Sequence, residues 1–293
     1  DFVPELKIQT TIIKDYSFLV IGYNEDQVKI SVPPDAGIEE DLDACVFARR
    51  TLNFVPDGWQ AEALGSEVPR VIFNCCRQSG KSSIAAIKAL HRGISFSHQL
   101  ILLLSPSLRQ SGELFRKVTE YATRVKVLPE KVEDSKLFVT FANGSRIVSL
   151  PSKEETIRGF SGVNLLIEDE AAQVSDDLYR AARPMLAVSG GHLLLMSTPR
   201  GKRGHFYHEW AEGGPGWERI EVKAGDCPRI DKAFLADEIR ALGPRWYRQE
   251  YECSFEDLED SVFDYDTVNA AMDEDVKPLF GVAVSDAVKP LFG

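Results

Sequence analysis

The sequence predicts an α/β fold: a mainly parallel central sheet flanked by helices, with a small β meander in front of it. Two observations carry this prediction. From residue 70 onward, apolar runs of strand length alternate with segments of helical periodicity. Before that, residues 6–33 alternate between polar and apolar side chains, as strands of a meander do. We therefore expect a meander and linker at 1–43, an α/β domain at 44–256 and a linker at 257–293.

The composition is that of an ordinary globular chain. Of the 293 residues, 44% are hydrophobic and 27% are charged. No apolar stretch approaches the length of a membrane span, and the N-terminus has no basic-then-apolar signal pattern. The five cysteines are an odd number without a C-x-x-C pair or a metal-ligand spacing. This pattern indicates a reducing cytoplasm, in which the thiols serve as small buried side chains.

The net charge of −11 argues against a surface covered with non-specific nucleic-acid contacts. Local basic patches remain open, because DNA senses charges within a Debye length of about 8–10 Å. One candidate patch is the Gly-bearing loop with Arg200, Lys202 and Arg203, and a second is the pair Arg245 and Arg248. The alternative for each patch is a solvated face, which is the commoner outcome.

Three short segments form the expected meander, with a turn at 24–26 and a Pro- and Gly-bearing, then acidic, linker at 33–41. The expected strands of the meander are residues 6–8, 17–21 and 27–30.

Strands and helices then alternate, as in layered sheets with right-handed crossovers. A helix over 83–90 is expected to end at Gly93, and Ser107 and Ser175 are the expected N-caps of later helices. The Asn-Gly pair at 143–144 indicates a hairpin. Ligands of such sheets bind at the carboxyl ends of the strands. The expected strands are residues 71–73, 100–104, 137–139, 146–148, 163–167, 193–196 and 220–222.

A phosphate-binding loop is predicted directly after the strand at 71–73. Residues 75–82 read Cys-Cys-Arg-Gln-Ser-Gly-Lys-Ser, and a closing Gly-Lys-Ser before a helix is typical of loops whose N–H groups bind nucleotide phosphates. Cys75 stands where the usual pattern has Gly, so a chance Gly-Lys-Ser at a helix start is the alternative. The expected nucleotide-binding residues here are Arg77, Gln78, Ser79, Gly80, Lys81, Ser82 and Ser83.

Several of these side chains bring specific chemistry. Lys81 supplies positive charge to the β- and γ-phosphates, and Ser82 offers a hydroxyl to Mg²⁺. Arg77 is a further cation that can form paired hydrogen bonds with phosphate, with a surface arginine as the alternative. Ahead of the strand, Gln60 carries an amide that can read an adenine edge, unless Trp59-Gln60 is a surface pair at a helix start.

An acidic motif follows the apolar strand at 163–167. Asp169 is expected to hold Mg²⁺, directly or through its waters, because this cation takes hard oxygen ligands. Glu170 is then the general base that polarises the attacking water. Glu168 occupies a position that is usually apolar in this motif. The two roles can therefore also be assigned one residue earlier, with Glu168 on the metal and Asp169 as the base. A solvated acidic turn is the remaining alternative.

The tripeptide Ser197-Thr198-Pro199 follows the next strand. Hydroxyl groups at a strand end can sense the γ-phosphate and relay its loss, although such a tripeptide can also be a simple turn. Its position, one helix and one strand after the acidic motif, favours the coupling role.

In order and spacing, these motifs resemble those of the large terminase subunits of tailed phages, over roughly residues 44–270. Residues 76–82 look like the Arg-Gln-containing phosphate loop of that family, and residues 168–172 resemble its Asp-Glu motif. The coupling motif of the family and its sequel are similar to Ser197-Thr198-Pro199, Gly201 and His205-Phe206-Tyr207. Further similar stretches are residues 47–60 at the start of the domain, 156–159 before the acidic motif, and 249–255 at the exit toward a nuclease.

The resemblance implies an ASCE-type P-loop ATPase that forms a homo-oligomeric ring on the portal of a procapsid and packages double-stranded DNA. Its cofactors would be ATP and Mg²⁺, its further partner a small terminase subunit, and its location the host cytoplasm, with no membrane involved. In isolation the chain could be a monomer. By this resemblance Arg77 joins the catalytic residues, and Arg158 is a finger inserted into a neighbour's site, worth ~10³–10⁵ in rate.

Some features depart from the family. Its second domain is an RNase H-like nuclease, and only about 40 residues follow Phe255, so we expect the motor half without intrinsic DNA cleavage. The hexapeptide at 276–281 recurs at 288–293, as an artefact or as a genuine duplication. Two other classes stay open. A DNA helicase or remodelling ATPase would need a second motor-like domain, and a nucleotide-binding scaffold would not use Glu170 for catalysis.

Overall fold

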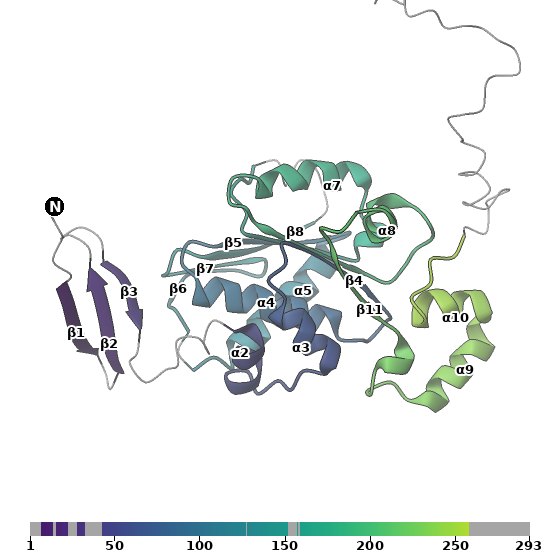
Figure 1. Cartoon of the computed structure of the whole chain (residues 1–293), viewed down its shortest axis with the longest axis horizontal. Coiled ribbons are helices and arrows are strands. Elements are labelled where there is room, and N and C mark those ends of the chain that lie inside the picture. The colour runs from purple at the N-terminus through teal and green to yellow at the C-terminus, as the bar shows by residue number, and fades with distance from the viewer. Residues whose placement is uncertain are drawn as a thin grey trace, which may run out of the picture.

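The computed structural model describes the backbone of three N-terminal strands and residues 43–126, 128–151, 157 and 159–257. The N-terminal strands are β1 (Lys7–Ile13), β2 (Tyr16–Gly22) and β3 (Val28–Val32), which pair antiparallel in chain order (Figure 1). This is the meander that the alternating sequence predicts. The expected turn at 24–26, the linker at 33–41 and the repeated hexapeptide lie outside the described residues.

The main body is built on one sheet with the strand order β11-β4-β10-β9-β5-β8-β7-β6 (Figure 1). Pairing is parallel from β11 through β8 and antiparallel from β8 to β6. The prediction of a mainly parallel sheet is therefore confirmed. The strands are β4 (Arg70–Cys75), β5 (Leu100–Ser105), β6 (Lys131–Asp134), β7 (Phe138–Phe141), β8 (Arg146–Pro151), β9 (Leu165–Asp169), β10 (His192–Ser197) and β11 (Glu218–Val222).

The strand order decides which segments meet at the edge of the sheet. β10 lies between β4, which leads into the phosphate loop, and β9, which ends in the acidic motif. Ser197 pairs in register with Asn74 on one side, and Met196 pairs with Asp169 on the other. Since these strands are parallel, the phosphate loop, the acidic motif and the Ser-Thr-Pro segment leave the sheet at the same edge.

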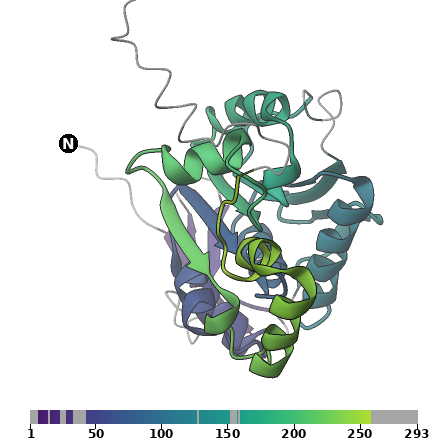
Figure 2. The same cartoon turned by 90° about the vertical axis from the view of Figure 1, so that its right-hand side faces the viewer.

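Helices cover both faces of this sheet (Figures 1 and 2). One face packs in a single core with α2 (Ala44–Arg50), α3 (Gly58–Gly65), α4 (Lys81–Ser95) and α5 (Leu108–Ala122). The other packs with α7 (Asp176–Ala182), α8 (Gly204–Ala211) and the 3-10 turn η2 (Arg183–Leu186). Side chains alternate between these cores along each strand, so Leu103 joins the first core and Leu102 the second.

The described chain closes with a helical pair beside the phosphate loop. After β11 come the 3-10 turn η3 (Ala224–Asp226), α9 (Lys232–Leu242) and α10 (Pro244–Tyr251). In Figure 2 this pair faces the viewer. Asn74 Nδ2 donates to the carbonyl of Cys253 at 2.9 Å, which ties the end of β4 to the segment after α10.

The local sequence signals have mixed outcomes. Ser107 and Ser175 accept hydrogen bonds from the N–H groups of Gln110 and Leu178, so both predicted N-caps are confirmed. The Asn-Gly pair at 143–144 does join two antiparallel strands, β7 and β8.

The expected helix end at Gly93 is wrong, because α4 continues to Ser95. Gly93 is buried inside the helix, and a Cβ there would lie 3.1 Å from Ile147 Cδ1. The glycine therefore allows α4 to lie close against β8.

Two expectations from composition concern cysteines and membranes. All five cysteines are free, and four of them are buried, as the absence of paired spacings predicts. Among the helices that the structure describes, none combines the length and apolar content required to cross a bilayer.

Candidate active site

The phosphate loop leaves β4 and turns into α4 at the carboxyl edge of the sheet. Gly80 is the N-cap of α4, with φ of 98°. A Cβ at this position would lie 2.7 Å from Gln60 Nε2, so both the backbone conformation and the close approach require glycine. The first N–H groups of a helix have no intrahelical partner, which makes the start of α4 suitable for an anion.

Lys81 brings three of the predicted motifs together. Its ammonium is buried, 3.5 Å from Glu170 Oε1 and 3.5 Å from Thr198 Oγ1. Ser197 Oγ lies 3.5 Å from the other carboxylate oxygen of Glu170. The phosphate loop, the acidic motif and the Ser-Thr-Pro segment thus form one cluster, as their positions at strand ends predict.

Glu170 has an uncommon backbone conformation. Its φ of 53° is in the left-handed region, which few non-glycine residues adopt. Its N–H donates to Asp169 Oδ1 at 3.0 Å. This turn takes Glu170 out of the alternation of β9 and aims its carboxylate at Lys81, and strained conformations of this kind often occur at functional sites.

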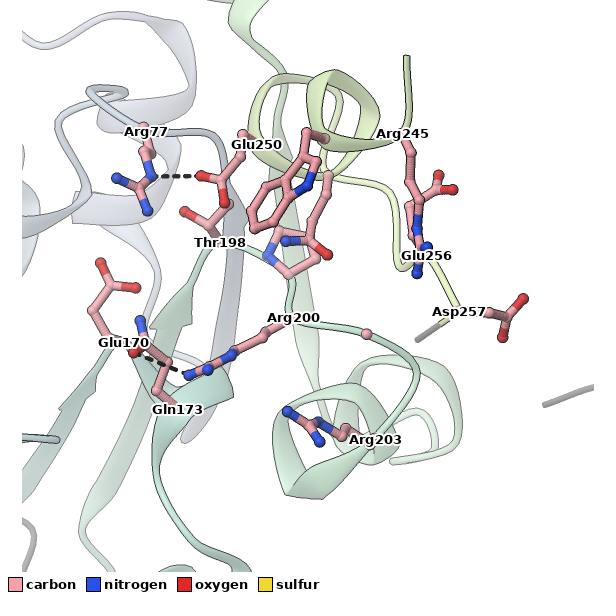
Figure 3. Close-up of a pocket in the computed structure, with 14 residues that line it drawn as sticks. Arg77, Glu170, Gln173, Thr198, Arg200, Arg203, Arg245, Glu250, Glu256 and Asp257 are labelled. Carbon is pink, nitrogen blue, oxygen red and sulfur yellow. Dashed lines mark hydrogen bonds and ion pairs between the residues drawn. The ribbon is translucent and has the colours of Figure 1, made fainter. Parts of the chain in front are cut away.

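Two cavities meet at Glu170. The larger one, of about 680 Å³, lies between the Ser-Thr-Pro segment and α10 (Figure 3). The smaller one, of about 440 Å³, is lined by Ser82, Asp169, Glu170 and residues at the start of α5. The two residues predicted to hold the metal, Ser82 and Asp169, therefore face the same space.

The acidic pair is suited to a divalent cation. Burial, followed by the charge of Glu170, raises the pKa of Asp169 to about 7, although Lys81 opposes this shift. A cation beside Ser82 and Asp169 would favour the ionised carboxylate, and hydroxyl and carboxylate oxygens are ligands that Mg²⁺ takes. No group of three or more His, Cys, Asp or Glu within the described ranges could hold a metal ion by itself. The donor set fits Mg²⁺ held jointly with a nucleotide.

Glu168 points to the other side of the sheet. It precedes Asp169 on β9, and its Oε1 lies 3.1 Å from Nε2 of His205 at the start of α8. Strand alternation places the two carboxylates on opposite faces. The geometry therefore favours Asp169 over Glu168 as the metal ligand, and both assignments remain predictions.

Arg77 is held by α10 in this structure. Its Nε donates to Glu250 Oε2 at 2.5 Å, and its side chain is 69% exposed (Figure 3). Its backbone N–H also donates to the carbonyl of Glu250, at 3.3 Å. Contact between Arg77 and a phosphate, which the sequence predicts, requires the guanidinium to leave this carboxylate or to share it.

Gln60 lies directly behind the phosphate loop and is 1% exposed. Its Oε1 accepts from the N–H of Asp57 at 3.0 Å, and its Nε2 donates to the carbonyl of Ser79 at 3.4 Å. Arg229 donates to the same carbonyl at 2.6 Å and pairs with Asp57. Both ends of the amide are engaged within the protein, so this geometry favours support of the loop over the predicted reading of adenine.

The remaining predicted residues lie along the same edge, with one exception. Gln78 is exposed, Ser79 is buried and Ser83 is half-buried in the first turn of α4. Pro199 lines the larger cavity. Arg158 is outside the described residues.

Members of both candidate basic patches meet at the larger cavity. Arg200, Arg203 and Arg245 all line the larger cavity. The other two cations are paired with acidic residues: Lys202 Nζ lies 3.7 Å from Asp257, and Arg248 donates to Glu256 at 2.8 Å.

Sequence reasoning missed Glu250 and Arg229. They contact the phosphate loop from positions 173 and 150 residues away along the chain. Glu250 lies in the stretch 249–255 that resembles the family, and Arg229 belongs to no motif, but nothing in the sequence indicates that either residue contacts the phosphate loop. These contacts follow from the way in which β11 returns the chain to the edge of β4.

The strand inserted between β4 and β9, together with a loop lysine facing the acidic turn, defines an ASCE-type P-loop NTPase fold. The family model described as "Terminase large subunit, T4likevirus-type, N-terminal" matches residues 72–270. The chain therefore belongs to the large terminase subunit family of tailed phages and corresponds to its ATPase domain.

Individual relatives agree with this assignment. The large terminase subunit of Escherichia phage T5 is 28% identical over 243 residues, which are 78% of this chain and 53% of the T5 protein. The chain thus spans about half the length of this relative.

Solved structures share the fold. A mutant of the large terminase ATPase domain of Thermus phage P74-26 has a TM-score of 0.64 at 21% identity, covering 71% of this chain and 97% of that one. A large terminase from a thermophilic bacteriophage, in complex with ADP, has a TM-score of 0.52 at 14% identity, covering 74% of this chain and 53% of that one.

The position of Gln60 yields a test of its role. If its amide supports the loop, Gln60→Leu will weaken ATP and GTP binding together, by about 3- to 10-fold, because the Ser79 carbonyl loses one hydrogen bond. Competition with a fluorescent nucleotide measures both dissociation constants. A selective loss of ATP affinity, with GTP binding unchanged, would instead show that the amide reads adenine.

Proposed function

We propose that this chain hydrolyses ATP with Mg²⁺, and that hydrolysis drives the translocation of double-stranded DNA during viral genome packaging. The observation that supports this most directly is the position of Lys81, 3.5 Å from both Glu170 and Thr198. Phosphate binding, water activation and coupling need residues at a single point, and this contact joins the three motifs. The large terminase of the thermophilic bacteriophage has been solved with ADP and with ATP-gamma-S, which supports ATP as the nucleotide here.

Each motif has its own part in this reaction. The N–H groups at the start of α4 and the Lys81 ammonium bind the phosphates, and Arg77 adds a contact once it leaves Glu250. Ser82 and Asp169 would hold Mg²⁺, which neutralises charge on the β- and γ-phosphate oxygens. Glu170 orients the attacking water and accepts its proton.

The contact between Lys81 and Glu170 gives nucleotide binding a second effect. The ammonium lies beside the carboxylate of the general base, 3.5 Å from its Oε1. A triphosphate carries more negative charge than this carboxylate and competes for the ammonium. Glu170 is thereby released to act on water only when a nucleotide is bound. Thr198 contacts Lys81 and Ser197 contacts Glu170, so both hydroxyls respond when the γ-phosphate leaves.

We further propose the setting that the family assignment supports. The chain acts in the host cytoplasm as a homo-oligomeric ring on the portal of a procapsid, together with a small terminase subunit. Arg158 reaches into the site of the neighbouring subunit and stabilises charge in the transition state. Isolated subunits are then slow, because each site lacks this cation.

Substitutions at Glu170 and Lys81 separate chemistry from binding. Glu170→Gln is expected to bind ATP with Mg²⁺ normally but to lose turnover by about 10²- to 10⁴-fold, because the amide cannot accept the proton. Lys81→Ala is expected to lose nucleotide affinity instead. Phosphate release and fluorescent-nucleotide binding measure the two effects, with the exposed Glu120→Gln as a control. Near wild-type turnover in Glu170→Gln would refute its assignment as the base and make Asp169 the next candidate.

The packaging assignment is tested by activity in the assembled state. We expect the ATPase rate to rise steeply with protein concentration, double-stranded DNA and procapsids, because assembly supplies the trans cation. Arg158→Ala should bind ATP yet lose this rise, by about 10³-fold or more. Mixing it with Glu170→Gln should restore part of the rate. Where the two variants are neighbours in the ring, the Arg158→Ala subunit supplies an intact Glu170 and its Glu170→Gln neighbour supplies an intact Arg158.

A rate that does not depend on concentration or procapsids would contradict the packaging motor. A mixture without any recovery would contradict the trans role of Arg158 alone.

A further inference from the structure

A buried ion pair lies on the face of the sheet opposite the phosphate loop. Glu168 is 1% exposed, and its Oε1 lies 3.1 Å from His205 Nε2. Within the described part of the chain, neither oxygen of Glu168 forms a hydrogen bond, so the ion pair with His205 is the contact that offsets the burial of its charge. A carboxylate in this position is costly, because the strand around it faces an apolar core. The charge of Glu168 therefore depends on His205, its only partner among the described residues.

His205 is fixed on both nitrogens and on one ring face. Its Nδ1 lies 3.2 Å from Asp176 Oδ1, and its backbone N–H donates to the same oxygen at 2.7 Å. Its ring stacks on Tyr179 with centroids 4.3 Å apart, and Tyr179 in turn donates to Glu209 at 2.7 Å.

The surroundings favour the charged form of His205. Burial alone lowers the pKa of His205, but the hydrogen bonds and charges of Glu168 and then Asp176 outweigh this effect and raise it. A charged imidazole carries a proton on each nitrogen, so Nδ1 can donate to Asp176 while Nε2 forms the ion pair with Glu168.

This one imidazole joins three segments that surround the general base. Glu168 lies on β9, two residues before Glu170. Asp176 begins α7, which is separated by two residues from the 3-10 turn η1 (Ala171–Gln173) that follows Glu170. His205 lies in the first turn of α8, the helix that follows the Ser-Thr-Pro segment. A shift of α8 relative to β9 would therefore break the pair and move Glu170 relative to Thr198.

We propose that His205 is a positioning residue that, through Glu168, holds the strained Glu170 turn and the Ser-Thr-Pro segment in the geometry required for hydrolysis. This inference rests on the proposed ATP hydrolysis. A pair of well-packed apolar side chains would fill the same space without the cost of burying charge. What such side chains would not supply is a directional contact that fixes β9, α7 and α8 at one point.

The test separates this role from simple stabilisation by removing both charges at once. In the full chain, the double variant Glu168→Leu/His205→Leu leaves no buried charge unpaired and is expected to melt close to the wild-type temperature. Its ATP dissociation constant should stay within about two-fold, while kcat falls by about 10- to 100-fold, as expected when a catalytic group is misplaced by a fraction of an ångström. Melting curves, nucleotide binding and steady-state turnover with DNA and procapsids give the three quantities.

Single variants supply the matched controls. His205→Gln keeps a donor for Glu168 and should retain more of kcat than His205→Leu. His208→Leu, an exposed histidine on the same helix, should leave kcat unchanged. Equal loss in the Gln and Leu variants, or wild-type kcat in the double variant, would overturn the inference while leaving the proposed function intact. A wild-type chain without ATPase activity would overturn both.

Discussion

The buried ammonium of Lys81 is the interaction on which the rest of this site depends. A lysine is rarely buried unless it is paired, and here its partners are Glu170 and Thr198, each at 3.5 Å. Those partners come from two other strand ends, so the contact exists only because β10 separates β4 from β9 in a parallel sheet. The ammonium also offsets part of the repulsion between Asp169 and Glu170. The order of the strands therefore determines both the burial of Lys81 and the electrostatics of the site.

The two faces of the sheet carry different parts of the site. The face covered by α4 and α5 holds the phosphate loop, Asp169 and the cavity beside Ser82. The face covered by α7 and α8 holds Glu168 and its contact with His205. Because consecutive residues of a strand point in opposite directions, a single acidic run can serve both faces. Glu170, which leaves the strand in a left-handed turn, lies between them.

The sequence predicts those parts of the structure that are determined by residues close together in the chain. Apolar runs predict the strands of the sheet except β6, whose four residues are all exposed, because strands buried on both faces have no polar side. Ser107 and Ser175 predict helix starts because a cap needs only its own turn. The meeting of Lys81, Glu170 and Thr198 is also predictable, since parallel strands deliver their carboxyl ends to one edge. The contacts of Glu250 with Arg77, and of Arg229 with Ser79, are not predictable, because they depend on where the chain returns after β11. The wrong prediction of a helix end at Gly93 has a related cause. The need for glycine at this position comes from its close contact with Ile147, which belongs to another element and cannot be inferred from neighbouring residues.

The most direct test of the account is an experimental structure of the full chain with Mg²⁺ and a non-hydrolysable ATP analogue. We expect the triphosphate at the start of α4, with Lys81 moved from Glu170 to the phosphates and the metal beside Ser82 and Asp169. Nucleotide bound elsewhere on the molecule, or bound at the loop while Lys81 stays on Glu170 and Asp169 faces no metal, would contradict it.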